Sequence, residues 1–392
     1  MSTESIVIVS AKRTPLGAFQ GIYQNMSSTQ LGSVALKGAL EAGCVEPDHI
    51  DEVLMGCVLP AGLGQAPARQ AALGAGLLKQ TACVTINKVC GSGLKSVMLA
   101  HDLIKAGSAE IILAGGMESM TNAPYLLPKA REGMRIGHQE VLDHMMLDGL
   151  QDAYSNRTPM GVFAEATAEK YGFTREDQDA FAIESGKRAL KAMDSGAFKD
   201  EICPVEIAGR NETLEISQDE PPSKIKFDKI PTLKPAFKKD GTLTAANSSS
   251  ISDGAAAVLL MTESRAKELG LKPLARIVAH AQYSREPEWF TLAPVGAIER
   301  VLEKAKWTQD QVDLFEINEA FAVVTMAAMK DLKLDHKKVN VHGGACALGH
   351  PIGASGARIL VTLLHALKSK QKGIASLCIG GGEAVAMAVE KF

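Results

Sequence analysis

Short apolar runs rich in β-branched residues alternate along the chain with longer stretches in which apolar residues recur at helical spacing. The short runs are typical of buried strands and the longer periodic stretches are typical of helices. The strands that this pattern predicts cover residues 6–9, 52–55, 111–113, 256–261, 314–317 and 375–379. The helices that it predicts cover residues 29–42, 93–106, 175–192, 298–305, 320–329 and 356–367. The alternation indicates an α/β fold with mostly central strands.

One pattern occurs twice: small residues, a helix, a strand, a glycine pair and a glutamate. The first copy runs from residue 91 to 118 and the second from 354 to 383. Because the copies lie far apart, we interpret them as two duplicated halves and not as a repeat array. The alternative is a chance similarity between two glycine-rich helix–strand units.

The middle of the chain is richer in proline, methionine and charged residues than the two ends. We predict an N-terminal α/β half over residues 1–121 plus 250–271, an inserted loop domain over 122–249, and a C-terminal α/β half over 272–392. Long insertions over an α/β scaffold commonly shape binding sites.

Composition narrows the possible functions. The chain has 392 residues, 46% of them hydrophobic, which is enough for two or three packed units. The formal net charge is −3 and no long basic tract is present, so we expect no nucleic-acid partner. No apolar run approaches the length of a membrane span, and the N-terminus has no basic or apolar leader, so we expect a cytoplasmic protein without a membrane partner.

The 7 cysteines are an odd number without C-x-x-C pairs. This usage indicates reduced thiols, and no metal-ligand spacing is evident. We therefore expect no metal site.

Cys90 stands in the sequence Asn-Lys-Val-Cys-Gly-Ser-Gly, between strand-like residues 84–86 and the helix predicted at 93–106. A cysteine at such a junction directs its sulfur toward the positive end of a helix, which favours the thiolate. Gly91 and Gly93 leave the backbone N–H groups open to a substrate carbonyl. We interpret Cys90 as a nucleophile that holds an acyl group. The alternative is a small buried hydrophobic residue, the usual state of a free cysteine.

Three further segments contain candidate catalytic residues. His350 lies between glycines and a proline just before a helix, where an imidazole can act as a base or donate to an oxyanion. Cys378 ends a predicted strand and precedes a triple-glycine turn whose N–H groups could bind an anion, although a cysteine there is usually structural. Asn318 follows the predicted strand 314–317, at the edge of the sheet where ligands gather, and could alternatively be only a helix N-cap.

Together these four segments resemble the thiolase family, and the resemblance covers essentially the whole chain. Further matching stretches are residues 10–15, 114–120, 176–179 and 253–256. The resemblance implies a duplicated five-layer α-β-α-β-α architecture with an inserted loop domain.

The resemblance also implies a role for each residue. Cys90 is the acylated nucleophile, and His350 activates it and then helps to bind the thioester oxygen. Cys378 is the acid/base at the α-carbon. Asn318 anchors a water in an oxyanion hole shared with His350, and the backbone N–H groups of Cys90 and Gly380 form a second oxyanion hole.

The implied reaction is the reversible Claisen condensation of two acetyl-CoA to acetoacetyl-CoA and CoA, with CoA thioesters as substrates and no other cofactor. The implied assembly is a homotetramer, a dimer of dimers. Lys224 matches a position near the nucleotide of CoA and Ser249 one near the pantetheine, although Lys224, Lys226 and Lys229 could equally form a solvated surface. The positions that match the pocket lining are Met160, Leu150, Phe237, Phe290 and Phe321.

Two departures from the family pattern leave the acyl chain length and branching open. Pro159 stands before Met160 where members acting on acetoacetyl-CoA typically carry histidine, and Phe290 stands where several bacterial members have methionine. His342 and Cys346 receive no role.

The main alternative is a degradative 3-ketoacyl-CoA thiolase with a broader chain-length range. A second alternative is a ketosynthase that uses an acyl carrier protein. Such enzymes usually have a second histidine or an asparagine where this chain has Cys378. Intact Cys90 and Cys378 argue against a non-catalytic lipid-binding relative. A nucleotide dehydrogenase is disfavoured because no G-x-G-x-x-G follows the first strand.

Overall fold

A single mixed sheet forms the centre of the molecule. The computed structural model describes residues 4–209 and 212–392. The strands lie in the order β12-β13-β14-β11-β1-β10-β5-β3-β4, and the short β2 pairs with β10. The bounds of the strands are Ile6–Arg13 (β1), Gly17–Ala18 (β2), Glu52–Gly56 (β3), Ala82–Ile86 (β4), Ile111–Ser119 (β5), Ser252–Thr262 (β10), Ala275–Ser284 (β11), Leu314–Ile317 (β12), Lys372–Ile379 (β13) and Glu383–Lys391 (β14).

The two halves of the sheet join at the antiparallel pair β1 and β11, where Ile6 lies opposite Ile277. Successive side chains of each strand point to opposite faces. In β1, Ile6 and Ile8 enter the central core, whereas Val7 and Val9 enter the core on the outer face. Because both faces are covered, the strands read as nearly continuous apolar runs.

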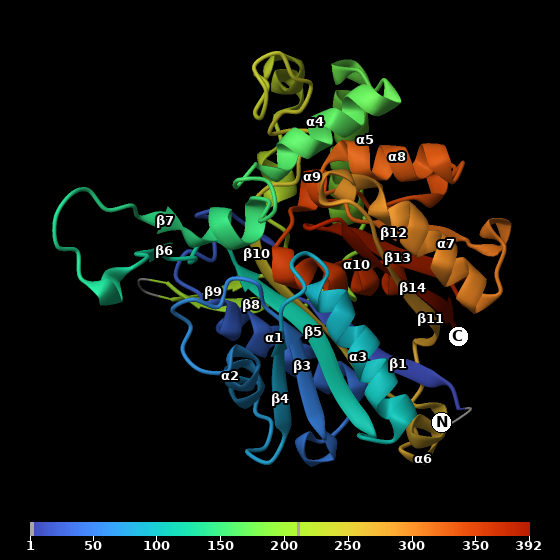
Figure 1. Cartoon of the computed structure of the whole chain (residues 1–392). Helices are drawn as coiled ribbons and strands as arrows, with labels where there is room; N and C mark the ends of the chain where they lie inside the picture. Colours follow the sequence, from blue (N-terminus) through green and yellow to red (C-terminus); the bar gives the residue numbers. More distant parts are fainter. Residues whose placement is uncertain (1–3, 210–211) are drawn as a thin grey trace.

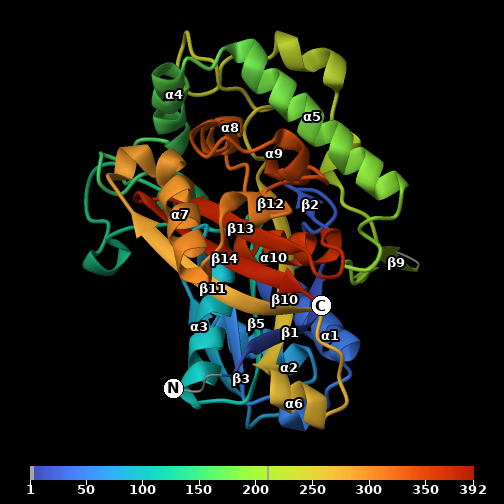
Figure 2. The same cartoon turned by 90° about the vertical axis from the view of Figure 1, so that its right-hand side faces the viewer.

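Helices form three layers around this sheet, as Figures 1 and 2 show. α3 (Ser92–Ala106) and α10 (Ile352–Ala366) pack together in the central core between the two halves. α1 (Ser28–Gly43) and α2 (Pro67–Gly74) cover the outer face of the N-terminal half. α7 (Ala293–Ala305) and α8 (Ala322–Asp331) cover that of the C-terminal half. The two halves of the sheet form two β layers, which alternate with the three helix layers. The five-layer α-β-α-β-α architecture is therefore confirmed.

The two central helices approach each other very closely at their N-terminal ends. A Cβ on Gly93 would lie 2.8 Å from the backbone nitrogen of Ala357, and one on Gly356 would clash with the backbone of Leu94. Both contacts involve backbone atoms that cannot move aside, so only glycine fits at either position. This contact brings the Cys90 loop next to the segment that contains His350.

The glycine pairs of the two repeat copies have different structures. Gly115 and Gly116 lie inside β5, where a Cβ would clash with the backbone of β10 or of α10. In the second copy, Gly381 and Gly382 form the turn between β13 and β14, with φ of +88° and +87°. The helix–strand order of both copies is as predicted, but the glycines serve close packing in one and a left-handed turn in the other.

The segment between β5 and β10 lies over one end of the layers. It contains the projecting β6–β7 hairpin on the left of Figure 1 and two helices above the C-terminal half. The bounds of these elements are Tyr125–Leu126 (β6), Leu142–Asp143 (β7), the π-helical turn Met146–Leu150, Met160–Tyr171 (α4), Arg175–Asp194 (α5), Val205–Ala208 (β8) and Thr213–Ile216 (β9).

Several elements begin earlier than the apolar pattern predicts. α7 starts at Ala293 because Pro294 in its first turn favours a helix start. β11 and β14 were not predicted, since their alanine-rich sequences have low strand propensity. The short helices α6 (Glu263–Glu268) and α9 (Ala345–Leu348) complete the fold.

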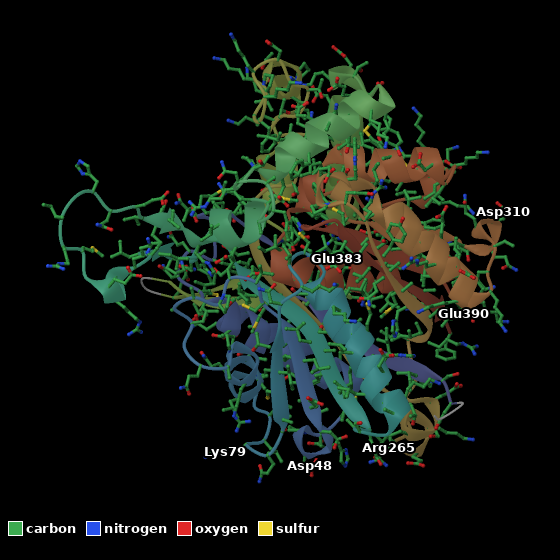
Figure 3. All side chains as sticks on the ribbon, viewed as in Figure 1. Asp48, Lys79, Arg265, Asp310, Glu383 and Glu390 are labelled. Carbon is green, nitrogen blue, oxygen red and sulfur yellow. The ribbon has the colours of Figure 1, made fainter. Side chains whose placement is uncertain are left out.

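Charged side chains such as Asp48, Lys79 and Asp310 project outward from the loops at the periphery (Figure 3). Within the described part of the chain, no helix is both long and apolar enough to cross a membrane.

Candidate active site

Cys90 lies in a tight turn between the end of β4 and the start of α3. The turn is closed by the Ser92 hydroxyl, which accepts from the Lys88 N–H at 2.8 Å and donates to the Val89 carbonyl at 2.7 Å. Val89 has a φ of +47°, a left-handed conformation that is a real outlier for a β-branched residue. Such strain persists only where the surroundings enforce it, and it often marks a functional site.

The ionisation of Cys90 differs from the sequence-based expectation. Burial raises the pKa of the thiol to about 11, and the nearby Glu118 charge contributes to the increase. The backbone N–H groups of Gly380 and of Cys90 itself act in the opposite direction but do not outweigh burial. The expectation that the helix end alone favours a thiolate is therefore wrong, because it ignored desolvation. At neutral pH the thiol keeps its proton and needs a base.

His350 is the candidate for that base. It follows Gly349, whose φ is +97°, and its N–H donates to the Ser250 carbonyl at 3.0 Å. Burial and the charge of Arg358 lower the imidazole pKa to about 3, so the ring is neutral at pH 7. A neutral imidazole can accept a proton.

The hydrogen bonds around His350 identify its tautomer. Ser355 Oγ donates to the Pro351 carbonyl at 2.8 Å, so its only proton is used there. The same oxygen lies 2.5 Å from His350 Nδ1, and we assign the hydrogen of this contact to Nδ1. Nε2 is then unprotonated, and it has no partner among the described residues. The free lone pair of this buried nitrogen can accept the proton of a thiol.

Asn318 lies beside this imidazole, directly after β12. Its Nδ2 is 3.4 Å from His350 Nδ1, and its Oδ1 has no hydrogen-bond partner in the part of the chain that the structure describes. α8 begins only at Ala322 and its N-cap is Phe321, so the N-cap alternative for Asn318 is excluded.

Cys378 is fully buried at the end of β13. Burial, together with the charge of Cys90, raises the pKa of its thiol well above the usual value. The second cause shows that the two sulfurs lie close enough to influence each other's ionisation. Gly380, two residues further on, directs its N–H toward the sulfur of Cys90. Cys90 and Cys378 therefore belong to one site, in which Cys378 is buried and Cys90 is partly accessible.

The predicted pocket residues surround this site. Met160, Phe237, Phe290 and Phe321 pack in one apolar cluster with Cys378. The Phe321 ring lies 5.7 Å from the Phe237 ring and 6.4 Å from the Phe290 ring. Leu150 belongs to a second cluster, which contacts Cys90. Four of the five residues thus share a cluster with Cys378, whereas Leu150 lies in the other cluster, with Cys90.

The two predicted CoA contacts lie further out. Lys224 lines a cavity of about 590 Å³ together with Lys226 and Lys229. Its ammonium forms an ion pair with Glu220 at 2.5 Å. Cys346 lines the same cavity, as does Ser250, whose carbonyl accepts from the His350 N–H, so the cavity reaches the neighbourhood of His350. Ser249 is not part of the cavity lining, and its hydroxyl donates to the Ala320 carbonyl at 2.9 Å.

Two buried carboxylates at the site were not found from the sequence. Glu118 accepts from the N–H groups of Val58, Leu59 and Gly353 at 2.8–3.1 Å and thereby ties β5 to the start of α10. Burial raises its pKa to about 7. Glu319 accepts from Ser185, Asn340 and the Cys346 N–H. Glu118 stands in the stretch 114–120 and Glu319 directly follows Asn318, and a charged residue within an apolar run was the signal that could have identified them.

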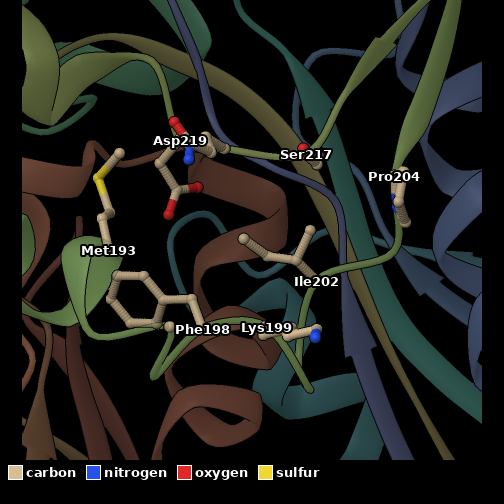
Figure 4. A pocket seen from close by; sticks show the side chains of 9 residues that line it. Met193, Phe198, Lys199, Ile202, Pro204, Ser217 and Asp219 are labelled. Carbon is tan, nitrogen blue, oxygen red and sulfur yellow. The ribbon is translucent and has the colours of Figure 1, made fainter.

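A second cavity, of about 450 Å³, lies apart from the cysteines (Figure 4). Its one acidic group, Asp219, is already bound bidentately by the buried Arg13. None of the residues predicted from the sequence as site residues lines it. Its lining consists of Met193, Gly196, Phe198, Lys199, Ile202, Pro204, Ser217, Gln218 and Asp219.

Comparisons with known proteins agree along the whole chain. A family model described as the thiolase N-terminal domain matches residues 6–264, and one described as the thiolase C-terminal domain matches residues 271–391. An acetyl-CoA acetyltransferase of Cupriavidus necator is 51% identical over 98% of this chain and 99% of its own length. One of Pseudomonas aeruginosa is 49% identical over 99% and 100%. The crystal structure of a thiolase from Ascaris suum in complex with coenzyme A superposes with a TM-score of 0.95, at 43% identity, over 99% of this chain and 100% of that chain.

Proposed function

The chain belongs to the thiolase family, and we propose on this basis that it is an acetyl-CoA acetyltransferase that reversibly condenses two acetyl-CoA to acetoacetyl-CoA and CoA. The observation that carries the proposal is the pair of thiols, Cys90 and Cys378, which influence each other's ionisation, with the N–H of Gly380 directed at the sulfur of Cys90. The buried, neutral imidazole of His350, whose Nε2 has no partner among the described residues, supports the role of base. The names of the similar proteins support the same activity.

The first half-reaction forms an acyl-enzyme. His350 Nε2 takes the proton of Cys90, and the resulting thiolate attacks the thioester carbonyl of acetyl-CoA. The backbone N–H groups of Cys90 and Gly380 stabilise the oxyanion, and donors of this kind are worth about 3 kcal/mol each. The C–S bond to CoA breaks, and the leaving sulfur takes the proton of Cys378. The products are acetylated Cys90, free CoA, an imidazolium and a Cys378 thiolate.

The second half-reaction uses the two charges that the first one leaves. The Cys378 thiolate removes an α-proton from a second acetyl-CoA. The enolate oxygen receives a hydrogen bond from the protonated His350 Nε2 and from a water held by Asn318. The α-carbon then attacks the acetyl group on Cys90, acetoacetyl-CoA forms, and the released Cys90 thiolate recovers its proton from His350. All protons are returned, so the cycle is closed and reversible.

The aromatic side chains around Cys378 support a short acyl chain. Phe290 and Phe321 are buried in the same cluster as this cysteine, so bulky rings narrow the space next to its sulfur. A long 3-ketoacyl chain, as in the degradative alternative, would need this space. Lys224, Lys226 and Lys229 line the neighbouring cavity, and their positive charges suit the phosphates of CoA.

A chain-length series separates the two activities. The kcat/KM for thiolysis of acetoacetyl-CoA is compared with that for 3-ketohexadecanoyl-CoA, and 2-methylacetoacetyl-CoA tests branching. We expect acetoacetyl-CoA to be the better substrate by at least tenfold. Equal or faster thiolysis of the long-chain substrate would favour the degradative 3-ketoacyl-CoA thiolase.

Exposed apolar surface supports assembly into a homotetramer. β4 is an edge strand with Val84 exposed, and an unpaired edge of this kind favours pairing with another chain. The projecting β6–β7 hairpin exposes Tyr125, Val141 and Ile136, the last of them 94% accessible. Light scattering should give about four times the chain mass of 41.5 kDa, and a monomer would contradict this assembly.

All seven cysteines are free thiols, which supports a reducing, cytoplasmic location.

A further inference from the structure

A cluster of two histidines and an aspartate lies where α3 meets β11. His101 and Asp102 are on the third turn of α3, and His280 is on β11, the first strand of the C-terminal half. Figures 1 and 2 show this helix and strand next to each other. At 1.5 Å per residue, His101 is about 13 Å along the helix from its first residue, so the cluster is separate from the active site.

The three side chains converge on one point. His101 Nδ1 lies 3.0 Å and His280 Nε2 2.9 Å from the same carboxylate oxygen, Oδ1 of Asp102. The two nitrogens are 3.3 Å apart, and the rings are nearly perpendicular at 87°. Each residue thus presents one ligand atom to a common centre, from two elements that belong to different halves of the fold.

This triangle has the dimensions of one face of a metal coordination shell. With metal–ligand bonds of about 2.05 Å, neighbouring ligand atoms are about 2.9 Å apart in an octahedron and about 3.3 Å apart in a tetrahedron. The three observed separations, 2.9, 3.0 and 3.3 Å, fall within this range. We propose that His101, Asp102 and His280 bind a divalent transition-metal ion of the zinc, cobalt or nickel class.

The chemistry and exposure of the cluster fit such an ion. Two imidazoles and one carboxylate are a common ligand set for divalent transition metals. The imidazoles are mostly buried, whereas Asp102 is 53% exposed at its side chain, so water can complete the coordination shell.

Two positive charges next to the cluster moderate its affinity. Lys304 donates to the backbone carbonyl of His280 at 3.1 Å, and Lys105 is one turn beyond His101 on α3. Both lower the pKa of a neighbouring histidine, Lys105 that of His101 and Lys304 that of His280. They would likewise repel a cation. A bound ion would fasten the helix that begins beside Cys90 to the C-terminal half, and we assign it this stabilising role.

The simpler alternative is a hydrogen-bonded cluster in which Asp102 accepts from two imidazole N–H groups without any metal. Co²⁺ distinguishes the two, because its visible spectrum reports its ligands. The full-length protein is titrated with CoCl₂ at pH 7.5, and binding is followed by calorimetry, by the visible d–d bands and by the midpoint of thermal unfolding. We expect one ion per chain, weak d–d bands without a sulfur charge-transfer band, and a rise in the unfolding midpoint.

Variants locate the site. His280→Gln and Asp102→Asn should each weaken Co²⁺ binding at least tenfold. The Asp102 side chain is half exposed, so Asp102→Asn should leave folding intact. His49→Gln, which changes an exposed histidine elsewhere, should bind as the wild type does. Unchanged binding in both cluster variants, a sulfur charge-transfer band that places the ion on a cysteine, or the absence of saturable binding to the wild-type protein would each overturn the proposal.

Discussion

Ser355→Ala tests the tautomer assigned to His350. Ser355 is buried on α10. In this assignment, its oxygen accepts the Nδ1–H of the imidazole, and its hydroxyl donates to the Pro351 carbonyl. Removal of this hydroxyl leaves a buried N–H without an acceptor, whereas the Pro351 carbonyl still accepts from the backbone of α10. The tautomer with a free Nε2 therefore loses its stabilisation.

The size of the effect follows from the cost of an unsatisfied buried donor, about 1–3 kcal/mol. If this cost falls on the tautomer that acts as a base, the equilibrium ratio of this tautomer to the other decreases by about 5- to 160-fold, since 1.36 kcal/mol corresponds to a factor of ten, and 160-fold is the upper limit of the loss in its population. We expect the rate of Cys90 acetylation to fall by this factor. The KM for acetyl-CoA should change little, because Ser355 does not line the cavity proposed for CoA.

The assay is a rapid-quench measurement of the acetyl adduct on the protein after mixing with acetyl-CoA. Thr362→Ala is the matched control: it removes another buried hydroxyl from α10, one that donates to Glu201 and not to the imidazole. The control should acetylate at the wild-type rate. Equal acetylation rates for Ser355→Ala and the wild type would refute the tautomer assignment.

Two further predictions concern the other groups of the site. Cys378→Ala should still form the acetyl adduct on Cys90, but more slowly than the wild type, because the leaving CoA sulfur loses its proton donor. Condensation should fall by about 10²- to 10⁴-fold, the usual contribution of an acid–base group, and an unchanged condensation rate in a coupled assay would remove Cys378 from this role. The pH dependence of stability gives a second prediction. The pKa of His350 is about 3 in the folded chain and about 6.5 in the unfolded chain, so below pH 6.5 the unfolded state binds a proton that the native state does not bind. The free energy of unfolding therefore falls as the pH falls below about 6.5. Between pH 7 and pH 5 the wild type should lose about 2 kcal/mol more than His350→Asn in urea unfolding at a fixed protein concentration, and parallel pH dependence of the two proteins would show that His350 is readily protonated in the fold.

The parts of the fold that the sequence predicts correctly are those with strong local patterns. The strand, glycine turn and helix around Cys90 are adjacent in sequence, and so are the turn at His350 and the start of α10. The alanine-rich strands β11 and β14 lack such a pattern. Their place in the sheet is set instead by pairing with each other and by the packing of α7 on them.

The parts that the sequence does not predict depend on contacts between distant residues. The pKa of Cys90 is opposite to the local expectation because desolvation by burial in the folded chain outweighs the backbone N–H groups of Gly380 and Cys90. Glu118 reaches Gly353 across 235 positions, and His280 reaches Asp102 across 178. No spacing rule along one chain detects such pairs.

The central claim is that Cys90 is the residue that holds the acetyl group. The most direct test is peptide mass spectrometry after the protein has been mixed with acetyl-CoA and quenched in acid. We expect a single acetyl adduct on the peptide that contains Cys90, and no adduct in Cys90→Ala. An adduct on another cysteine, or an acetylated Cys90→Ala protein with normal turnover, would contradict it.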